Sequence, residues 1–190
     1  MGALASVEQR DEVLKSIRGL TKSADIVFGD PNVDNAPGAF LGPVLLKAGD
    51  KSAPEPHEIE AFGPVSTVIG YDDTADLLDL VARGKGSLVA SLVTKDSVIA
   101  REVVLGSAPY HGRILVLNRD DARESTGHGS PLPVLVHGGP GRAGGGEELG
   151  GIRGVLHHMQ RTAIQGTPDV LTAVGNRWVA GASRTTSDVH

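Results

Sequence analysis

The sequence predicts an α/β protein in which a mostly parallel sheet is built from βαβ units and has helices on both faces. Between residues 65 and 118, three apolar runs typical of strands alternate with two segments of helical periodicity. The connections between them are short, so consecutive strands are expected to run parallel across helical crossovers. The strands are apolar at nearly every residue, which is typical of a sheet covered on both faces.

The N-terminal region predicts one helix and two short strands. Ser6 and Gln9 have the spacing of a capping box, and apolar residues recur with helical spacing up to Gly19, which we interpret as the end of the helix. Residues 26–28 form a short apolar run that is closed by Gly-Asp-Pro, and residues 44–46 form a second run after a polar loop. We expect both runs to be strands.

The central region predicts the βαβ units themselves. Strands are expected over residues 65–71, 88–94 and 113–118. Asp73 and Asp96 each precede a segment with helical periodicity. Both are predicted N-caps, because a carboxylate at that position accepts hydrogen bonds from the first backbone N–H groups of a helix.

The C-terminal region predicts a helix, a helical turn and a final strand. The helix is expected from Ile152, with Ala163 and Ile164 on its apolar side, and the turn over residues 168–174. Residues 177–180 predict a terminal strand. Such a strand on a short tail needs a partner sheet, which another subunit could provide.

The composition excludes several classes of function. The chain has 190 residues, 39% of them hydrophobic and 22% charged, which is typical of one globular domain. Its net charge of −5 argues against a nucleic-acid partner. We expect no membrane span and no signal peptide, and therefore a cytoplasmic protein. Because the sequence contains no Cys, it has no disulfide, no thiolate metal ligand and no cysteine nucleophile.

Residues 119–151 are predicted to form a long loop, and such loops in compact domains are often functional. Within it, Gly139 to Gly144 match the spacing Gly-x-Gly-x-x-Gly of dinucleotide-binding loops. However, Pro140 has no N–H for a phosphate, and further glycines at 145 and 146 delay the helix that should follow. We therefore expect a shaped loop at the mouth of a site, with independent nucleotide binding by this loop as an alternative.

No histidine or serine pattern predicts a metal centre or a serine hydrolase. His157 and His158 are adjacent on a predicted helix and face different directions, so they cannot share a metal. Three further histidines lie in predicted loops without a paired spacing: His111, His128 and His137. The serines considered as nucleophiles lack a Gly-x-Ser-x-Gly turn: Ser91, Ser107 and Ser130.

The segment from His57 to Tyr71 is the most informative part of the sequence. It turns at Gly63-Pro64, where proline restricts the preceding residue to extended conformations. Glu60 and Phe62 are two residues apart, so in an extended segment they share one side. A carboxylate beside an aromatic ring can receive a sugar diol next to a flat heterocycle. The alternative is a surface glutamate and a core phenylalanine.

The motifs along the chain resemble, in order, the C-terminal part of the catalytic domain of aldehyde dehydrogenases. Residues 60–65, Glu-Ala-Phe-Gly-Pro-Val, are similar to the family's Glu-Ile-Phe-Gly-Pro-Val. Other similar segments are Gly38-Ala39-Phe40 before Pro43-Val44-Leu45, Gly86 to Ala90 before Thr94-Lys95-Asp96, Gly112-Arg113-Ile114 before Asn118, and residues 144–151. A narrower resemblance, over residues 137–151 and 157–163, is to PaaZ/PaaN-like semialdehyde dehydrogenases of phenylacetate degradation.

The resemblance implies NAD- or NADP-dependent oxidation of an aldehyde, specifically the semialdehyde of a CoA-linked, ring-opened acid. Glu60 corresponds to the family glutamate whose carboxylate accepts both ribose hydroxyls beside the nicotinamide. Phe62 corresponds to the residue that packs near the nicotinamide and limits its motion. Ala61 replaces the family's usual isoleucine and leaves a smaller wall.

The departure from the family pattern concerns the catalytic groups. The family reaction needs a Cys thiolate to attack the aldehyde and a Glu base for acyl hydrolysis, and by the family's order both precede Met1. We therefore expect a fragment that has no catalytic residue of its own and is inactive alone. The alternative is a non-catalytic module that interacts with, or complements, a full-length homologue.

The resemblance also suggests how the chain is divided. We expect a partial catalytic domain over residues 1–166, an oligomerisation tail over 167–182 and a linker or frayed end over 183–190. The expected partners are the aldehyde or CoA-linked semialdehyde substrate and either further copies of the chain or a complementing chain. Neither nucleic acid nor a membrane is expected as a partner.

Overall fold

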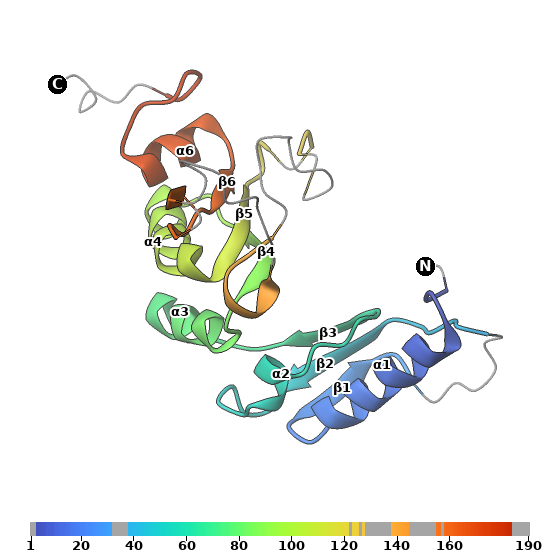
Figure 1. Cartoon of the computed structure of the whole chain (residues 1–190). Coiled ribbons are helices and arrows are strands. Elements are labelled where there is room, and N and C mark those ends of the chain that lie inside the picture. Colours follow the sequence, from blue (N-terminus) through green and yellow to red (C-terminus); the bar gives the residue numbers. More distant parts are fainter. Residues whose placement is uncertain are drawn as a thin grey trace. The chain divides into compact units, whose positions relative to one another are not determined.

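The computed structural model describes residues 3–31, 38–121, 123–125, 127, 138–144, 155–156 and 158–183. The chain forms two compact units, Met1–Asp72 and Asp73–His190 (Figure 1). The predicted division between residues 166 and 167 falls inside the second unit, and it stays a prediction about family domains.

The first unit contains a three-stranded sheet, two helices and their connections. In chain order the elements are α1 (Val7–Leu20), β1 (Ala24–Phe28), β2 (Val44–Ala48), α2 (Glu55–Glu58) and β3 (Val65–Val68). The strand order is β1-β2-β3, with β1 antiparallel and β3 parallel to β2. A β-bulge between Ile26 and Phe28 interrupts the register of β1.

Helix α1 begins at the predicted cap. The Gln9 N–H donates to Ser6 Oγ over 3.1 Å, and the Ala5 N–H donates to Gln9 Oε1 over 3.0 Å. Two N–H groups at the start of the helix are thus satisfied by side chains, as in a capping box. The helix continues through Gly19 to Leu20, so Gly19 lies within the helix rather than after its end.

The core of the first unit lies between α1 and one face of the sheet. Val13, Ile17 and Leu20 project from α1 at helical spacing and are at most 3% exposed. They pack on buried residues of β1 and β2, namely Ala24, Val44 and Leu46. Burying each of these larger side chains contributes about 1.5–3 kcal/mol to folding, so the contact fixes α1 on the sheet.

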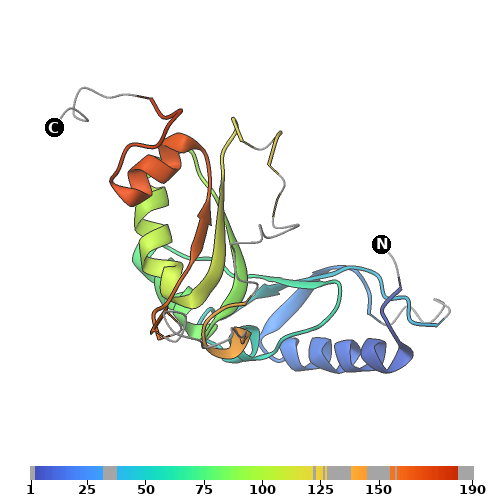
Figure 2. The ribbon, with the colours of Figure 1, turned by 45° about the horizontal axis from the view of Figure 1, so that its top comes forward.

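The second unit contains a parallel three-stranded sheet and its helices (Figure 2). Its strands run in the order β4-β5-β6, and both pairings are parallel. In chain order the elements are α3 (Thr74–Arg83), β4 (Ser87–Val93), α4 (Ser97–Ser107), η1 (Ala108–Tyr110), β5 (His111–Leu117), η2 (Gly141–Ala143), β6 (Ala163–Gln165) and α6 (Pro168–Gly175).

The predicted caps of the second unit are confirmed. Asp73 accepts from the Asp76 N–H at 2.9 Å, and Asp96 accepts from the Val98 and Ile99 N–H groups at 2.8 and 3.1 Å. At the C-terminal end of α6, the Arg101 side chain of α4 donates to the Ala173 and Val174 carbonyls. A guanidinium there satisfies terminal carbonyls and opposes the negative end of the helix dipole.

The core of the second unit lies between two helices and one face of the sheet. Ala100 and Val104 of α4, together with Val170 and Val174 of α6, pack on Ile114 and Val116 of β5. Helix α3 packs on α4, where Leu78 lies against Gly106.

The predicted fold class is confirmed, since the protein is α/β and three of the four described strand pairings are parallel. The strands form two sheets, however, and each core that the structure describes lies between helices and one face of a sheet. Residues 163–165 form strand β6 instead of continuing a helix. No helix in the described part of the chain is both long and apolar enough to cross a membrane.

The predicted terminal strand over residues 177–180 is wrong. Trp178 Nε1 donates to the Ala182 carbonyl at 3.2 Å, and the Val179 N–H donates to Thr172 Oγ1 at 2.9 Å. The segment therefore folds back on α6 of its own unit instead of forming a strand.

His111, the first residue of β5, makes the stability of the second unit sensitive to pH. It is 8% exposed, and its Nδ1 lies 3.2 Å from the Ser107 carbonyl oxygen, which fits a neutral ring that donates from this nitrogen. Burial lowers the pKa of His111 below its ordinary value. The unfolded chain therefore binds a proton at a pH where the folded chain does not.

We expect the free energy of unfolding of the second unit to fall as the pH drops through the ordinary histidine pKa of about 6.5 towards the lower folded value. Above about pH 7 this group should have no effect on stability. Urea unfolding across this range should show a weaker pH dependence for His111→Gln than for the parent chain. His57→Gln, in the first unit, is the control. An unchanged pH dependence in His111→Gln would contradict the role of burial.

Candidate functional site

The segment that precedes β3 presents Glu60 and Phe62 on the same side. Ile59 packs against the core of the first unit, Glu60 is exposed, Ala61 is half-buried and Phe62 is 70% exposed. This alternation has the period of two of an extended segment, as predicted. The alternative in which Phe62 belongs to the core is wrong, because the alternation turns its ring outward while Ile59 points inward.

The turn that follows is held by short backbone hydrogen bonds. The Gly63 N–H donates to the Ala61 carbonyl at 2.7 Å, and the Val65 N–H donates to the Gly63 carbonyl at 2.8 Å. The Pro64 carbonyl accepts from the Val44 N–H at 2.9 Å, where β2 begins beside β3. Pro64 has no N–H to satisfy, so it suits this position at the start of a strand.

Helix α1 contacts the same segment at three points, of which the hydrogen bond from Gln9 is solvent-exposed. Gln9 Nε2 donates to the Phe62 carbonyl at 2.8 Å. A Cβ on Gly63 would lie 2.8 and 2.9 Å from the two γ-methyl groups of Val13, so only glycine allows this approach. A Cβ on Gly19 would likewise lie 2.7 Å from Ile59 Cδ1. Gly63 is therefore explained by close packing between helix and segment, whereas the neighbour of Gly19 is the flexible end of the Ile59 side chain.

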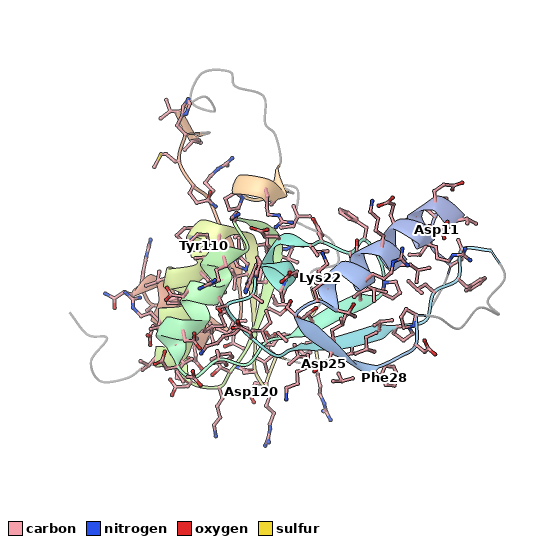
Figure 3. The ribbon with its side chains drawn as sticks, turned by 90° about the horizontal axis from the view of Figure 1, so that it is seen from below. Asp11, Lys22, Asp25, Phe28, Tyr110 and Asp120 are labelled. Atoms are coloured by element: carbon pink, nitrogen blue, oxygen red, sulfur yellow. The ribbon has the colours of Figure 1, made fainter. Side chains whose placement is uncertain are left out.

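The site lies at the edge of the first sheet where β2 and β3 begin and antiparallel β1 ends. Ligand sites of open α/β sheets usually lie at the carboxyl ends of parallel strands, so the turn is at the opposite end of β2 and β3. A cavity of about 270 Å³ opens at this edge. Its lining is mostly apolar and includes Phe28, labelled in Figure 3, with Pro43, Leu45, Gly63 and Pro64.

The glycine-rich motif of the second unit packs backbone against backbone. A Cβ on Gly86 would lie 2.0 Å from the Pro140 carbonyl oxygen, and one on Gly112 would lie 1.7 Å from the Gly138 carbonyl oxygen. A Cβ on Gly141 would lie 2.1 Å from the Lys85 carbonyl oxygen. The glycines therefore allow residues 138–142 to lie directly on the chain before β4 and at the start of β5.

This packing explains the Gly-x-Gly-x-x-Gly spacing without a ligand. The Arg142 N–H, which a phosphate loop would present to its ligand, donates to the Lys85 carbonyl at 3.0 Å. The second glycine of the motif, Gly141, begins the three-residue helix η2, and the third, Gly144, has a φ of 68°. The described part of this loop lies at the amino ends of β4 and β5, and its position at the mouth of a site stays a prediction.

The described residues contain no group of three His, Asp or Glu side chains placed to hold a metal ion. His111 is buried at the start of β5, Ser107 is buried at the end of α4, and Ser91 is exposed on β4. The other residues considered from the sequence lie outside the described part of the chain: His128, Ser130, His137 and His157.

The model of the aldehyde dehydrogenase family matches residues 1–120. The chain belongs to the aldehyde dehydrogenase family. The match includes Glu60, Phe62 and the Gly63-Pro64 turn, so the predicted family is confirmed on the segment that presents the candidate site.

Two curated relatives and one solved structure illustrate the similarity to this family. Protein MaoC of Klebsiella aerogenes is 50% identical, over 100% of this chain and 57% of that protein. The 3,4-dehydroadipyl-CoA semialdehyde dehydrogenase of Aromatoleum evansii is 38% identical, over 74% of this chain and 28% of that protein. The succinic semialdehyde dehydrogenase of Streptococcus pyogenes, solved with NADP⁺, matches with a TM-score of 0.61 at 21% identity, over 76% of this chain and 29% of that one.

The chain thus spans less than two thirds of each of these proteins. The structural match, at its low sequence identity, shows the fold alone. The sequence did not indicate that Gln9, Val13 and Gly19 contact the candidate site. The capping box placed Gln9 at the start of α1, but its second hydrogen bond, to the Phe62 carbonyl, is a contact between distant residues.

We expect Gly63→Ala to destabilise the first unit by about 1–3 kcal/mol, because the new methyl group overlaps the Val13 side chain. Urea unfolding measures this change. The double variant Gly63→Ala, Val13→Ala should be more stable than the sum of the two single changes predicts, since it removes the clash. Additive effects would show that Gly63 and Val13 are not in contact.

Proposed function

We propose that this chain provides the nicotinamide-facing part of an NAD- or NADP-dependent aldehyde dehydrogenase that oxidises a CoA-linked semialdehyde in phenylacetate-type aromatic degradation. The observation that supports it is the outward display of Glu60 and Phe62 on one side of a segment held by α1. The relative from Aromatoleum evansii, named for a CoA-linked semialdehyde, supports the substrate class.

The residues present fit one end of a nicotinamide dinucleotide. Glu60 is exposed and has two carboxylate oxygens, which suit the two hydroxyls of a ribose. The Phe62 ring is 70% exposed and lies on the same side, so it can pack against a flat heterocycle. The remaining contacts of the dinucleotide are proposed to come from polypeptide other than these 190 residues.

In this proposal the chain binds and orients the cofactor. When bound, the nicotinamide cofactor would accept the hydride from the substrate. Glu60 would anchor the ribose, and Phe62 would restrict the neighbouring ring to orientations suited to transfer. The sequence contains no Cys, so the thiol of the family reaction has to be supplied by other polypeptide. The isolated chain is therefore expected to show no thiol-dependent aldehyde oxidation.

Titration of the ¹⁵N-labelled chain with NADH and NADPH, followed by NMR, tests the proposed contact. We expect weak binding, in the millimolar range because most of the cofactor's contacts are absent, with amide shifts concentrated at residues 60–64. Glu60→Gln should weaken the shifts severalfold because an amide is a poorer acceptor for two hydroxyls, and Phe62→Ala should abolish ring-current shifts on the nicotinamide.

Glu58→Gln, an exposed carboxylate on α2, is the matched control and should leave the titration unchanged. Shifts that spread over the molecule, or that do not respond to Glu60→Gln, would contradict the proposal. Aldehyde oxidation by the purified chain with NAD or NADP would contradict the assignment of the thiol chemistry to other polypeptide.

An alternative function is a non-catalytic module that associates with a full-length homologue. It is favoured by apolar side chains exposed on the first unit, among them Val27 at 54%, Phe28 at 62% and Val68 at 49%. Phe28 also lines the cavity of about 270 Å³, so an exposed apolar side chain lies at the wall of a mostly apolar cavity. Such patches often mark interaction sites.

Gel filtration of the chain mixed with the Aromatoleum evansii dehydrogenase distinguishes the two functions. The module predicts co-elution that Phe28→Lys abolishes, since a charge in an apolar contact costs several kcal/mol. Val7→Lys, which changes an exposed apolar residue of α1, should leave co-elution intact. Independent elution of the two proteins would contradict the alternative and leave the cofactor-contact proposal standing.

A further inference from the structure

The Gln9 carboxamide is fixed from both of its ends. Its Oε1 accepts from the Ala5 N–H at 3.0 Å, and its Nε2 donates to the Phe62 carbonyl at 2.8 Å. The reverse orientation of the amide would bring two oxygens together at Phe62 and two N–H groups together at Ala5, so the contacts select one orientation. Gln9 therefore joins the start of α1 to the candidate site.

The Phe62 carbonyl, which accepts the hydrogen bond from Gln9 Nε2, differs from the neighbouring carbonyls of the turn in its donor. The carbonyls of Ala61, Gly63 and Pro64 accept from backbone N–H groups, at distances from 2.7 to 2.9 Å. The Phe62 carbonyl accepts from a side chain that comes from an element 53 residues away. Rotation of the backbone at Phe62 would break this bond, and the same rotation would swing the Phe62 ring.

The ring itself has little packing to hold its direction, because it is 70% exposed. The helix that carries Gln9 is, in contrast, rigidly seated, with Val13 1% and Ile17 2% exposed. The hydrogen bond from Gln9 therefore ties the backbone of Phe62, whose ring is exposed, to a helix that is fixed by its buried side chains.

We infer that Gln9 is a positioning residue, whose carboxamide sets the orientation of Phe62 and, two residues before it, of Glu60. The effect of Gln9 on cofactor binding rests on the proposed function. Its effect on the position of the turn does not. It extends the role of Gln9 beyond the capping of α1.

Gln9→Glu separates the two roles of this side chain. A glutamate at this position still accepts from the Ala5 N–H, and its negative charge is favourable in the first turn of a helix. It loses only the Nε2 donor and places a carboxylate against the Phe62 carbonyl. A purely structural role in capping therefore predicts no loss of stability in α1, whereas positioning predicts loosening confined to the turn.

The test combines amide hydrogen exchange with the NADH titration, both followed by NMR on the full 190-residue chain. In Gln9→Glu we expect the Gly63 and Val65 amides to exchange about fivefold faster, as for the loss of one hydrogen bond, while amides in the middle of α1 are unchanged. The NADH shifts at residues 60–64 should weaken to a similar degree. Gln160→Glu, the same change at an exposed position of the second unit, is the control.

Unchanged exchange at Gly63 and Val65 in Gln9→Glu would overturn the inference, whatever the titration shows. Faster exchange with no NADH shifts in the parent chain would instead support Gln9 as the residue that positions the turn and contradict the proposed function. Loss of protection throughout α1 would assign Gln9 to helix capping alone and also overturn the inference.

Discussion

The candidate site depends on the packing of helix α1 against the segment that leads into β3. Val13 and Ile17 fix the helix on the sheet, and Gly63 lets the segment approach within contact distance of Val13. Since Ile59 points into this contact, the pleat of the chain directs Glu60 and Phe62 outward. The exposure of the two residues is therefore a consequence of what is buried behind them.

The two units use glycine in the same way. In the first, Gly63 allows a helix to approach an extended segment, and in the second, Gly86 and Gly112 allow two backbone segments to touch. These glycines are explained by close approach rather than by phosphate binding. The nicotinamide contact is accordingly proposed at Glu60 and Phe62, where a family motif and outward side chains coincide, and not at the Gly-x-Gly-x-x-Gly segment.

Local signals predicted much of the fold, and long-range contacts explain the differences. The caps at Ser6, Asp73 and Asp96 depend on neighbouring residues alone, so the sequence was sufficient. Residues 163–165 are a short apolar run, which periodicity cannot assign to helix or strand, and pairing with β5 decides it. The tail at residues 177–180 folds back on the preceding α6, where Val179 bonds to Thr172, and the Phe62 carbonyl bonds to Gln9 of distant α1. Neither contact follows from a periodic pattern.

The most direct test of the account is a nuclear Overhauser measurement on the isotope-labelled chain. It asks whether the γ-methyl groups of Val13 lie next to the α-protons of Gly63, and whether the δ-methyl group of Ile59 lies next to Gly19. Strong cross-peaks at both places, together with none from the Phe62 ring to core methyl groups, are the predicted result. Cross-peaks from the Phe62 ring to Val13 or Ile17 would contradict the account, since they would place the ring in the core.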